Sequence, residues 1–197
     1  HRHRIEHNAL ITKEQIAQAE QLGITLSFFI DHIYYYGDKL EYIVGSERAE
    51  KFMPIQSAIS VGHNATIHTD NPATPIDPFR AISTAVMRKT KDDNVILGKN
   101  ERISVYDALK SITINAAWQL FEDQSRGSIT IGKSADLVIL SHNPLEINQE
   151  EIKNLSVIST WIDGKQVNHS IYTWKNFKLI LFIIYNYINT SIKEWFM

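Results

Sequence analysis

The sequence predicts an α/β fold, with a parallel sheet crossed by helices in its first part and a small β unit after it. Short apolar runs alternate with segments of helical period between residues 5 and 121. Strand-like runs replace this alternation after Gly127. Because alternating strands and helices form parallel sheets with helical crossovers, we expect the strands of the first part to be parallel.

The first helix and the strand after it are marked by their end residues. Thr12 and Gln15 have the spacing of a capping box, and Gly23 is a natural C-terminal stop. Residues 24–30 form a short apolar run, which indicates a buried strand. A helix and a strand therefore follow one another here.

The same order repeats along the first part. Residues 65–69 predict another strand, and Asp77 followed by Pro78 predicts a helix that reaches about Lys89. Aspartate caps free backbone N–H groups, and proline in the first turn has no N–H to leave unpaired. The other helices are expected to begin at Ser46, as the cap of a helix through Phe52, and at Pro54, Ser104 and Thr113.

The part after Gly127 has a different character. Residues 128–131, 136–140 and 157–162 are strand-like, and Asp163-Gly164 is a two-residue hairpin signal. From residue 169 the chain is rich in Ile, Tyr, Phe and Asn. Its apolar run is shorter than the roughly 20 residues that a membrane span needs, so no membrane partner is expected.

Composition limits the partners and the chemistry. The net charge of -2 and the pI of about 6.5 provide no basic field for nucleic acid, so a small molecule is the expected partner. The chain has no cysteine, which excludes disulfides and thiolate metal sites. Any metal must therefore be held by His, Asp or Glu.

Three candidate residues follow predicted strands: His7, His32 and Asp70. Functional side chains gather at the carboxyl ends of parallel strands, and two imidazoles with one carboxylate suit Zn²⁺ or a similar ion. Each residue also has a purely structural interpretation. His7 could cap a strand, His32 could hydrogen-bond in a loop, and Asp70 could form an Asx turn before Pro72. The spacing alone leaves both interpretations open.

Other polar and aromatic residues near these positions carry weaker expectations. His68 is expected to face the opposite side of its strand or to line the mouth of the site. His63, beside Gly62, is expected at the surface. The tyrosines at 34–36 are expected in the loop after His32, either walling a pocket or packing on other loops.

Several stretches read together resemble the carboxyl-terminal part of the amidohydrolase superfamily, and within it the YtcJ-like group, amidohydrolase family 3. They are "RIEH", "SFFIDHIYYYGD", "HTDNPATPIDP", "GSITIGKSADLVIL" and "DGKQV", and the resemblance runs from about residue 4 to residue 167. Members of this family are metal-dependent hydrolases of carbon–nitrogen bonds other than peptide bonds.

The resemblance implies a C-terminal portion, about strands 5–8, of a TIM-like (β/α)8 barrel plus part of a small β-sandwich. Residues 1–126 would be the second half of the barrel, 127–168 the sandwich portion and 169–197 an atypical tail. His7 and His32 would be metal ligands at the ends of strands five and six. Asp70, at the end of strand eight, would contact the metal and transfer a proton. The implied cofactor is a divalent metal, zinc first, and the implied substrate is a small amide.

The family's strand-one motif His-x-His is expected to be missing. His1-Arg2-His3 matches its letters, but no apolar strand precedes it and the chain opens without methionine, so we expect an incomplete chain. Two hypotheses follow: a fragment of a metal-dependent amidohydrolase, or a non-catalytic remnant that is inactive alone. A third, weaker hypothesis is membrane association through residues 177–192. A cytoplasmic location is expected, and a homo-oligomer is left open.

Overall fold

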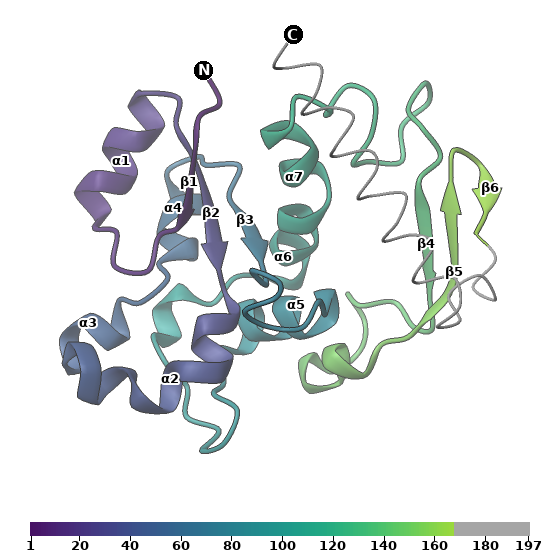
Figure 1. Ribbon diagram of the computed structural model, residues 1–197. Coiled ribbons are helices and arrows are strands. Elements are labelled where there is room, and N and C mark those ends of the chain that lie inside the picture. Colours follow the sequence, from purple (N-terminus) through teal and green to yellow (C-terminus); the bar gives the residue numbers. More distant parts are fainter. Residues whose placement is uncertain (168–197) are drawn as a thin grey trace, which may run out of the picture. The chain divides into compact units, whose positions relative to one another are not determined.

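The computed structural model describes residues 1–167 (Figure 1). The contacts divide the chain into His1–Gly164 and Lys165–Met197, and of the second unit only residues 165–167 are described. The predicted tail at 169–197, including the segment proposed for membrane association, lies outside the described residues. Within residues 1–167, no helix combines the length and apolarity that a membrane crossing requires.

A parallel sheet forms the centre of the first unit. Its strands β1 (Arg4–His7), β2 (Thr25–Phe29) and β3 (Thr66–His68) pair in this order, all parallel. The prediction of parallel strands is confirmed. The resemblance implied about four barrel strands, whereas the parallel sheet of the described residues has three. β2 pairs directly with β3, so no strand lies between them.

Helices connect these strands and continue after them, as Figure 1 shows. Their bounds are α1 (Lys13–Gln21), α2 (Asp31–Val44), α3 (Ser46–Glu50), α4 (Ile55–Ser60), α5 (Pro78–Met87), α6 (Val105–Ile112) and α7 (Ile114–Gln119), with the 3-10 helix η1 (Lys99–Glu101) before α6.

Helices begin at or directly after all six predicted positions, but α3 ends at Glu50 and not at Phe52, and the predicted cap of α3 is wrong. Thr12 and Gln15 form both bonds of the capping box of α1, and Asp77 and Ser104 each accept a backbone N–H at the starts of α5 and α6. Ser46 is not a cap. Gly45 holds that position with a φ of 82°, and the Ser46 hydroxyl instead donates to the Glu41 carboxylate.

Buried side chains surround β2, which is buried at every residue. Gln119 of α7 ties this strand to its neighbour: its amide donates to the Thr25 hydroxyl (2.7 Å) and to the Leu26 carbonyl (3.1 Å). Its oxygen accepts from the Thr66 hydroxyl of β3 (3.0 Å). This buried amide thus satisfies polar groups that the sheet alone leaves open.

Arg88 is a fully buried cation at the end of α5. Its guanidinium donates to the carbonyls of Leu97, Met53 and Phe52, and burial lowers its pKa to about 10. A charge without water is stable only when its donors are satisfied. Arg88 therefore fixes two chain segments against α5.

The β unit consists of β4 (Leu137–Leu140) and β5 (Val157–Ile162), which are antiparallel, with η2 (Gln149–Asn154) between them and β6 (Lys165–Gln166) after them. Asp163 and Gly164 both have positive φ, as a two-residue hairpin turn requires. The predicted strand at 128–131 is wrong. Among residues 1–167 its apolar side chains Ile129 and Ile131 are exposed, so periodicity alone misled there.

Candidate functional site

Three candidate residues lie where the parallel strands end. His7 is the last residue of β1, His32 is in the first turn of α2 directly after β2, and Asp70 follows β3. Loops at the carboxyl ends of parallel strands share one rim of a sheet. The fold therefore brings together residues that are far apart in the sequence.

The imidazole of His7 lies near both of the other side chains. Its Nε2 atom is 3.4 Å from Oδ2 of Asp70, and its ring centroid is 6.0 Å from that of His32. The side chains of His7 and Asp70 are both exposed to solvent. Two imidazoles and one carboxylate thus share an accessible rim.

The backbone at this rim is held in an uncommon conformation. His7, Asn8 and Asp70 have φ values of 72°, 55° and 51°, and such residues cost about 1–3 kcal/mol each unless the surroundings hold them. The buried Asn8 amide donates to the carbonyls of Ile5 (2.8 Å) and Ser27 (2.9 Å). These bonds join the end of β1 to β2 and support the turn that carries His7.

Aromatic rings surround His32. Its centroid lies 4.1 Å from Phe29, 5.3 Å from Tyr36 and 6.1 Å from Phe52. Burial lowers the pKa of His32, and the neighbouring His7 acts in the same direction, so the neutral imidazole is favoured. The Nδ1 atom of His32 is buried and has no hydrogen-bond partner among residues 1–167.

The turn after β3 places the Asp70 side chain toward His7. The turn itself is closed by the backbone, where the Ala73 N–H donates to the Asp70 carbonyl (2.7 Å). The carboxylate of Asp70 is the group that approaches His7. The structure thus separates the two roles weighed for this residue: the main chain makes the turn and the side chain remains available.

An open cavity of about 550 Å³ adjoins this rim. Its lining includes Glu6, His7, His68, Asp70 and Gln119. Side chains from all three strands of the sheet therefore contribute to one wall, which is polar where the strands end.

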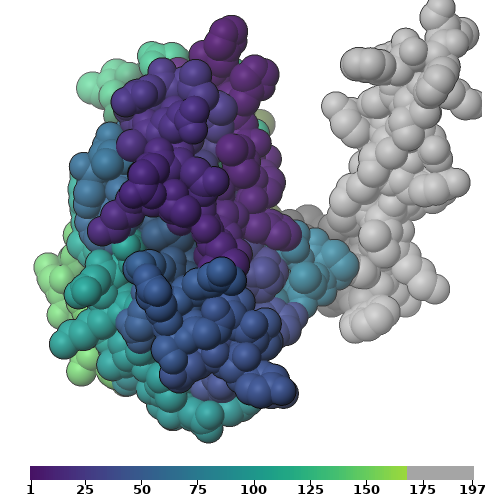
Figure 2. Space-filling model, turned by 90° about the vertical axis from the view of Figure 1, so that its left-hand side faces the viewer, coloured from purple at the N-terminus to yellow at the C-terminus, as the bar shows by residue number. Residues whose placement is uncertain are grey.

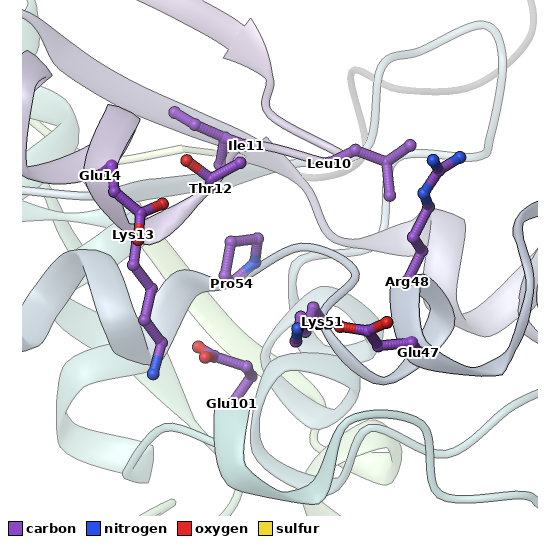
Figure 3. Close-up of a pocket in the computed structure, with 10 residues that line it drawn as sticks. All are labelled: Leu10, Ile11, Thr12, Lys13, Glu14, Glu47, Arg48, Lys51, Pro54 and Glu101. Carbon is purple, nitrogen blue, oxygen red and sulfur yellow. Dashed lines mark hydrogen bonds and ion pairs between the residues drawn. The ribbon is translucent and has the colours of Figure 1, made fainter.

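Another cavity of about 550 Å³ lies away from the histidines (Figure 3). It is found where the purple N-terminal segment meets the blue segment around α3 on the face shown in Figure 2. Its lining carries Lys13, Arg48, Lys51, Glu47 and Glu101, without any of the three candidate residues. We therefore place the candidate site at the rim.

The rim has donors of the types that zinc prefers, imidazole nitrogen and carboxylate oxygen. The buried Nδ1 of His32 and Nε2 of His68 have no hydrogen-bond partner among residues 1–167, so both are free to bind a ligand. Among residues 1–167, however, no three His, Asp or Glu side chains are arranged closely enough to hold an ion. The donor chemistry fits a metal, but the arrangement is an open, partial ligand set.

A family model described as "Amidohydrolase family" matches residues 1–168. The chain belongs to this family. The resemblance found in the sequence is confirmed, and the YtcJ-like assignment with it: YtcJ of Bacillus subtilis is 29% identical over 170 residues.

Two further curated proteins are similar to this amidohydrolase chain. "Protein LONG AFTER FAR-RED 3" of Arabidopsis thaliana is 36% identical, with 84% of this chain covered, and "N-substituted formamide deformylase" of Arthrobacter pascens is 28% identical, with 82% covered. The match to YtcJ covers 83% of this chain. This chain spans only 28% of the Arabidopsis protein, 31% of YtcJ and 30% of the deformylase.

Solved structures agree with the family. A metal-dependent hydrolase from Pyrococcus horikoshii has a TM-score of 0.64 at 26% identity, covering 75% of this chain and 30% of its own. The amidohydrolase chain thus shares its mixed α/β fold with a solved metal-dependent hydrolase.

Glu6 and His68 are residues of the amidohydrolase rim that sequence reasoning undervalued. Nε2 of His68 lies 3.7 Å from Oε2 of Glu6, and the His68 ring is 5.4 Å from His7. Burial raises the pKa of Glu6, but hydrogen bonds from Ser27 and Arg4 outweigh it, so the pKa is lowered. His68 lines the mouth, the second of the two expected placements. The signal for Glu6 was its place next to His7 in "RIEH".

Two other expectations for the amidohydrolase chain are wrong. His63 is buried, because its Nε2 atom is bonded to the Ile16 carbonyl (2.9 Å) between α1 and α4. The tyrosines at 34–36 lie in α2, not in a loop, since α2 begins at Asp31 immediately after β2. Of these tyrosines, Tyr36 packs on His32.

Proposed function

We propose that this chain is the C-terminal fragment of a metal-dependent hydrolase that cleaves non-peptide carbon–nitrogen bonds with activated water. The 3.4 Å approach of His7 to Asp70, beside His32, is the observation that carries the proposal. Family membership and the similarity to a formamide deformylase support it. The proposal includes residues 1–126 as the second half of a TIM-like barrel and 127–168 as part of a β-sandwich.

In this proposal His7, His32 and Asp70 would supply part of the ligand set of a divalent ion, zinc first, and further ligands would come from outside these 197 residues. Such an ion, when bound, polarises the scissile carbonyl and lowers the pKa of water from about 15.7 toward 7. The neutral imidazole of His32, favoured by burial, is the form that can donate a lone pair. Nε2 of His7 lies 3.4 Å from Oδ2 of Asp70, so these two donors are neighbours at the rim.

Asp70 is the proposed proton carrier. Its carboxylate accepts a proton from the attacking water and delivers it to the leaving nitrogen as the carbon–nitrogen bond breaks. Water and amide thus become an acid and an amine, with no other reactant. The substrate is a small amide that enters the cavity beside Glu6 and His68.

A second candidate is a non-catalytic remnant. The absence of a closed ligand group within residues 1–167 favours it. In this case the rim residues would keep their positions without binding a metal alone. The two candidates predict different metal contents.

We expect Asp70→Asn to abolish release of amine from N-substituted formamides, because the amide cannot accept the proton, and to lower zinc content only in part, because His7 and His32 remain. Zinc content by mass spectrometry and amine release are the measurements. Asp107→Asn, in the first turn of α6, is the matched control and should keep both. A purified chain without zinc or turnover would favour the remnant.

A further inference from the structure

Asp31, the residue before His32, is a completely buried carboxylate. It accepts a hydrogen bond from the Thr74 hydroxyl (2.9 Å) and another from Nη2 of Arg80 (2.8 Å). Nε of Arg80 lies 3.4 Å from its other oxygen. These partners all belong to the segment that follows Asp70, so one carboxylate joins the two loops of the rim.

Thr74 extends this connection toward Asp70. Its hydroxyl lies between the Asp31 carboxylate and the carbonyl of Thr69, and its single proton can be donated to one of them at a time. The Asn71 amide donates to the Thr74 carbonyl (3.3 Å). The loop that carries Asp70 is therefore bonded to itself and to the start of α2.

Arg80 is fixed from several sides. Its guanidinium also contacts the Asp77 carboxylate at 3.4 Å, donates to the Pro75 carbonyl and lies 5.2 Å from the Tyr35 ring centroid. Hydrogen bonds and the charge of Asp31 outweigh burial and raise the pKa of Arg80. The cation that holds Asp31 is thus itself held by the start of α5 and by α2.

We infer that Asp31, Thr74 and Arg80 position His32 and Asp70 relative to one another. A buried ion pair is weak evidence for stability, since its desolvation can exceed its attraction. A positioning role explains where the pair lies, because Asp31 directly precedes His32 and its partners Thr74 and Arg80 follow Asp70. This inference rests on the proposed function for its metal-binding consequence, but not for the mechanical coupling of the two loops.

The first test compares Asp31→Asn with Asp77→Asn, because both carboxylates contact Arg80 and only one joins the loops. Zinc affinity of the full chain is measured by competition with a chromophoric chelator. Asp31→Asn should weaken zinc affinity about 10- to 100-fold, the usual effect of removing a residue that holds metal ligands in position. Asp77→Asn keeps an N-cap for α5 and should change it by less than about threefold.

The second test uses milder variants, so that loss of folding does not decide the outcome. Thr74→Val removes the bridging hydroxyl, and Thr74→Ser retains it. Thr84→Val is the control, because Thr84 is also buried but its hydroxyl donates within α5 to the Arg80 carbonyl (2.8 Å). Thr74→Val should weaken zinc binding, Thr74→Ser should rescue it, and Thr84→Val should leave it unchanged.

Amide exchange of Ala73 in the metal-free chain separates this inference from the proposed function. The Ala73 N–H is protected by the Asp70 carbonyl, and Asp31→Asn and Thr74→Val should each speed its exchange about tenfold. If the wild-type chain binds no zinc, the metal proposal fails for this chain, and the exchange result still decides the coupling. Unchanged Ala73 exchange in both variants overturns the inference, as does unchanged zinc affinity where the wild type binds zinc.

Discussion

Strands β2 and β4 have similarly apolar sequences and opposite surroundings. β2, "TLSFF", is buried at every residue, whereas Leu137, Val138 and Ile139 of β4 are 37%, 53% and 49% exposed. β2 has a paired strand on each side and α7 bonded across it, while β4 pairs with β5. Apolar sequence therefore predicts a strand in both regions, but burial depends on the layers that cover it.

The largest change in the free energy of unfolding is expected when one side chain is truncated in each region. Phe28 of β2 is fully buried, so Phe28→Ala should lower the free energy of unfolding by about 4 kcal/mol through lost burial and a cavity. Ile139→Ala on β4 should lower it by less than about 1 kcal/mol, because its side chain is already half exposed. Urea unfolding measures both. Equal losses would show that the exposed face of β4 is covered in solution.

The next test removes the cation that fixes the first region. Arg88→Met leaves the carbonyls of Leu97, Met53 and Phe52 without their donor, and should cost about 3 kcal/mol in urea unfolding. Arg126→Met is the matched control in the region before β4. Its guanidinium is exposed and contacts Glu122 at 3.4 Å, so the change should stay within about 0.5 kcal/mol. A small loss for Arg88→Met would mean that water enters this site.

The sequence predicted most of the first region because its signals are local. The capping box at Thr12 and the Asp77-Pro78 start depend on neighbours within one helical turn, and both are confirmed. The error at residues 128–131 arose because alternation does not say whether a sheet is present to receive it. The predicted capping role of Ser46 is wrong for a similar reason, because its hydroxyl donates to the Glu41 carboxylate of the preceding helix.

The candidate site was predictable only in part. His7, His32 and Asp70 could be chosen because each follows a strand, and parallel pairing brings strand ends together. Their roles stay a prediction. The bonds of Asp31 to Thr74 and Arg80 span more than 40 residues and leave no local pattern, so only the fold reveals them.

The smallest expected effect is a pH dependence that belongs to the first region alone. Burial lowers the pKa of His32 and of His68, so the folded chain holds both imidazoles neutral more firmly than the unfolded chain does. Below the unfolded value of about 6.5, the unfolded state therefore binds more protons. The free energy of unfolding should fall as the pH drops from 7 to 5.

His68→Gln should flatten part of that slope when urea unfolding is measured at each pH. His142→Gln, an exposed histidine after β4, should leave the slope as it is. An equal flattening by both variants would remove the distinction, because burial at the rim would then have no bearing on proton binding.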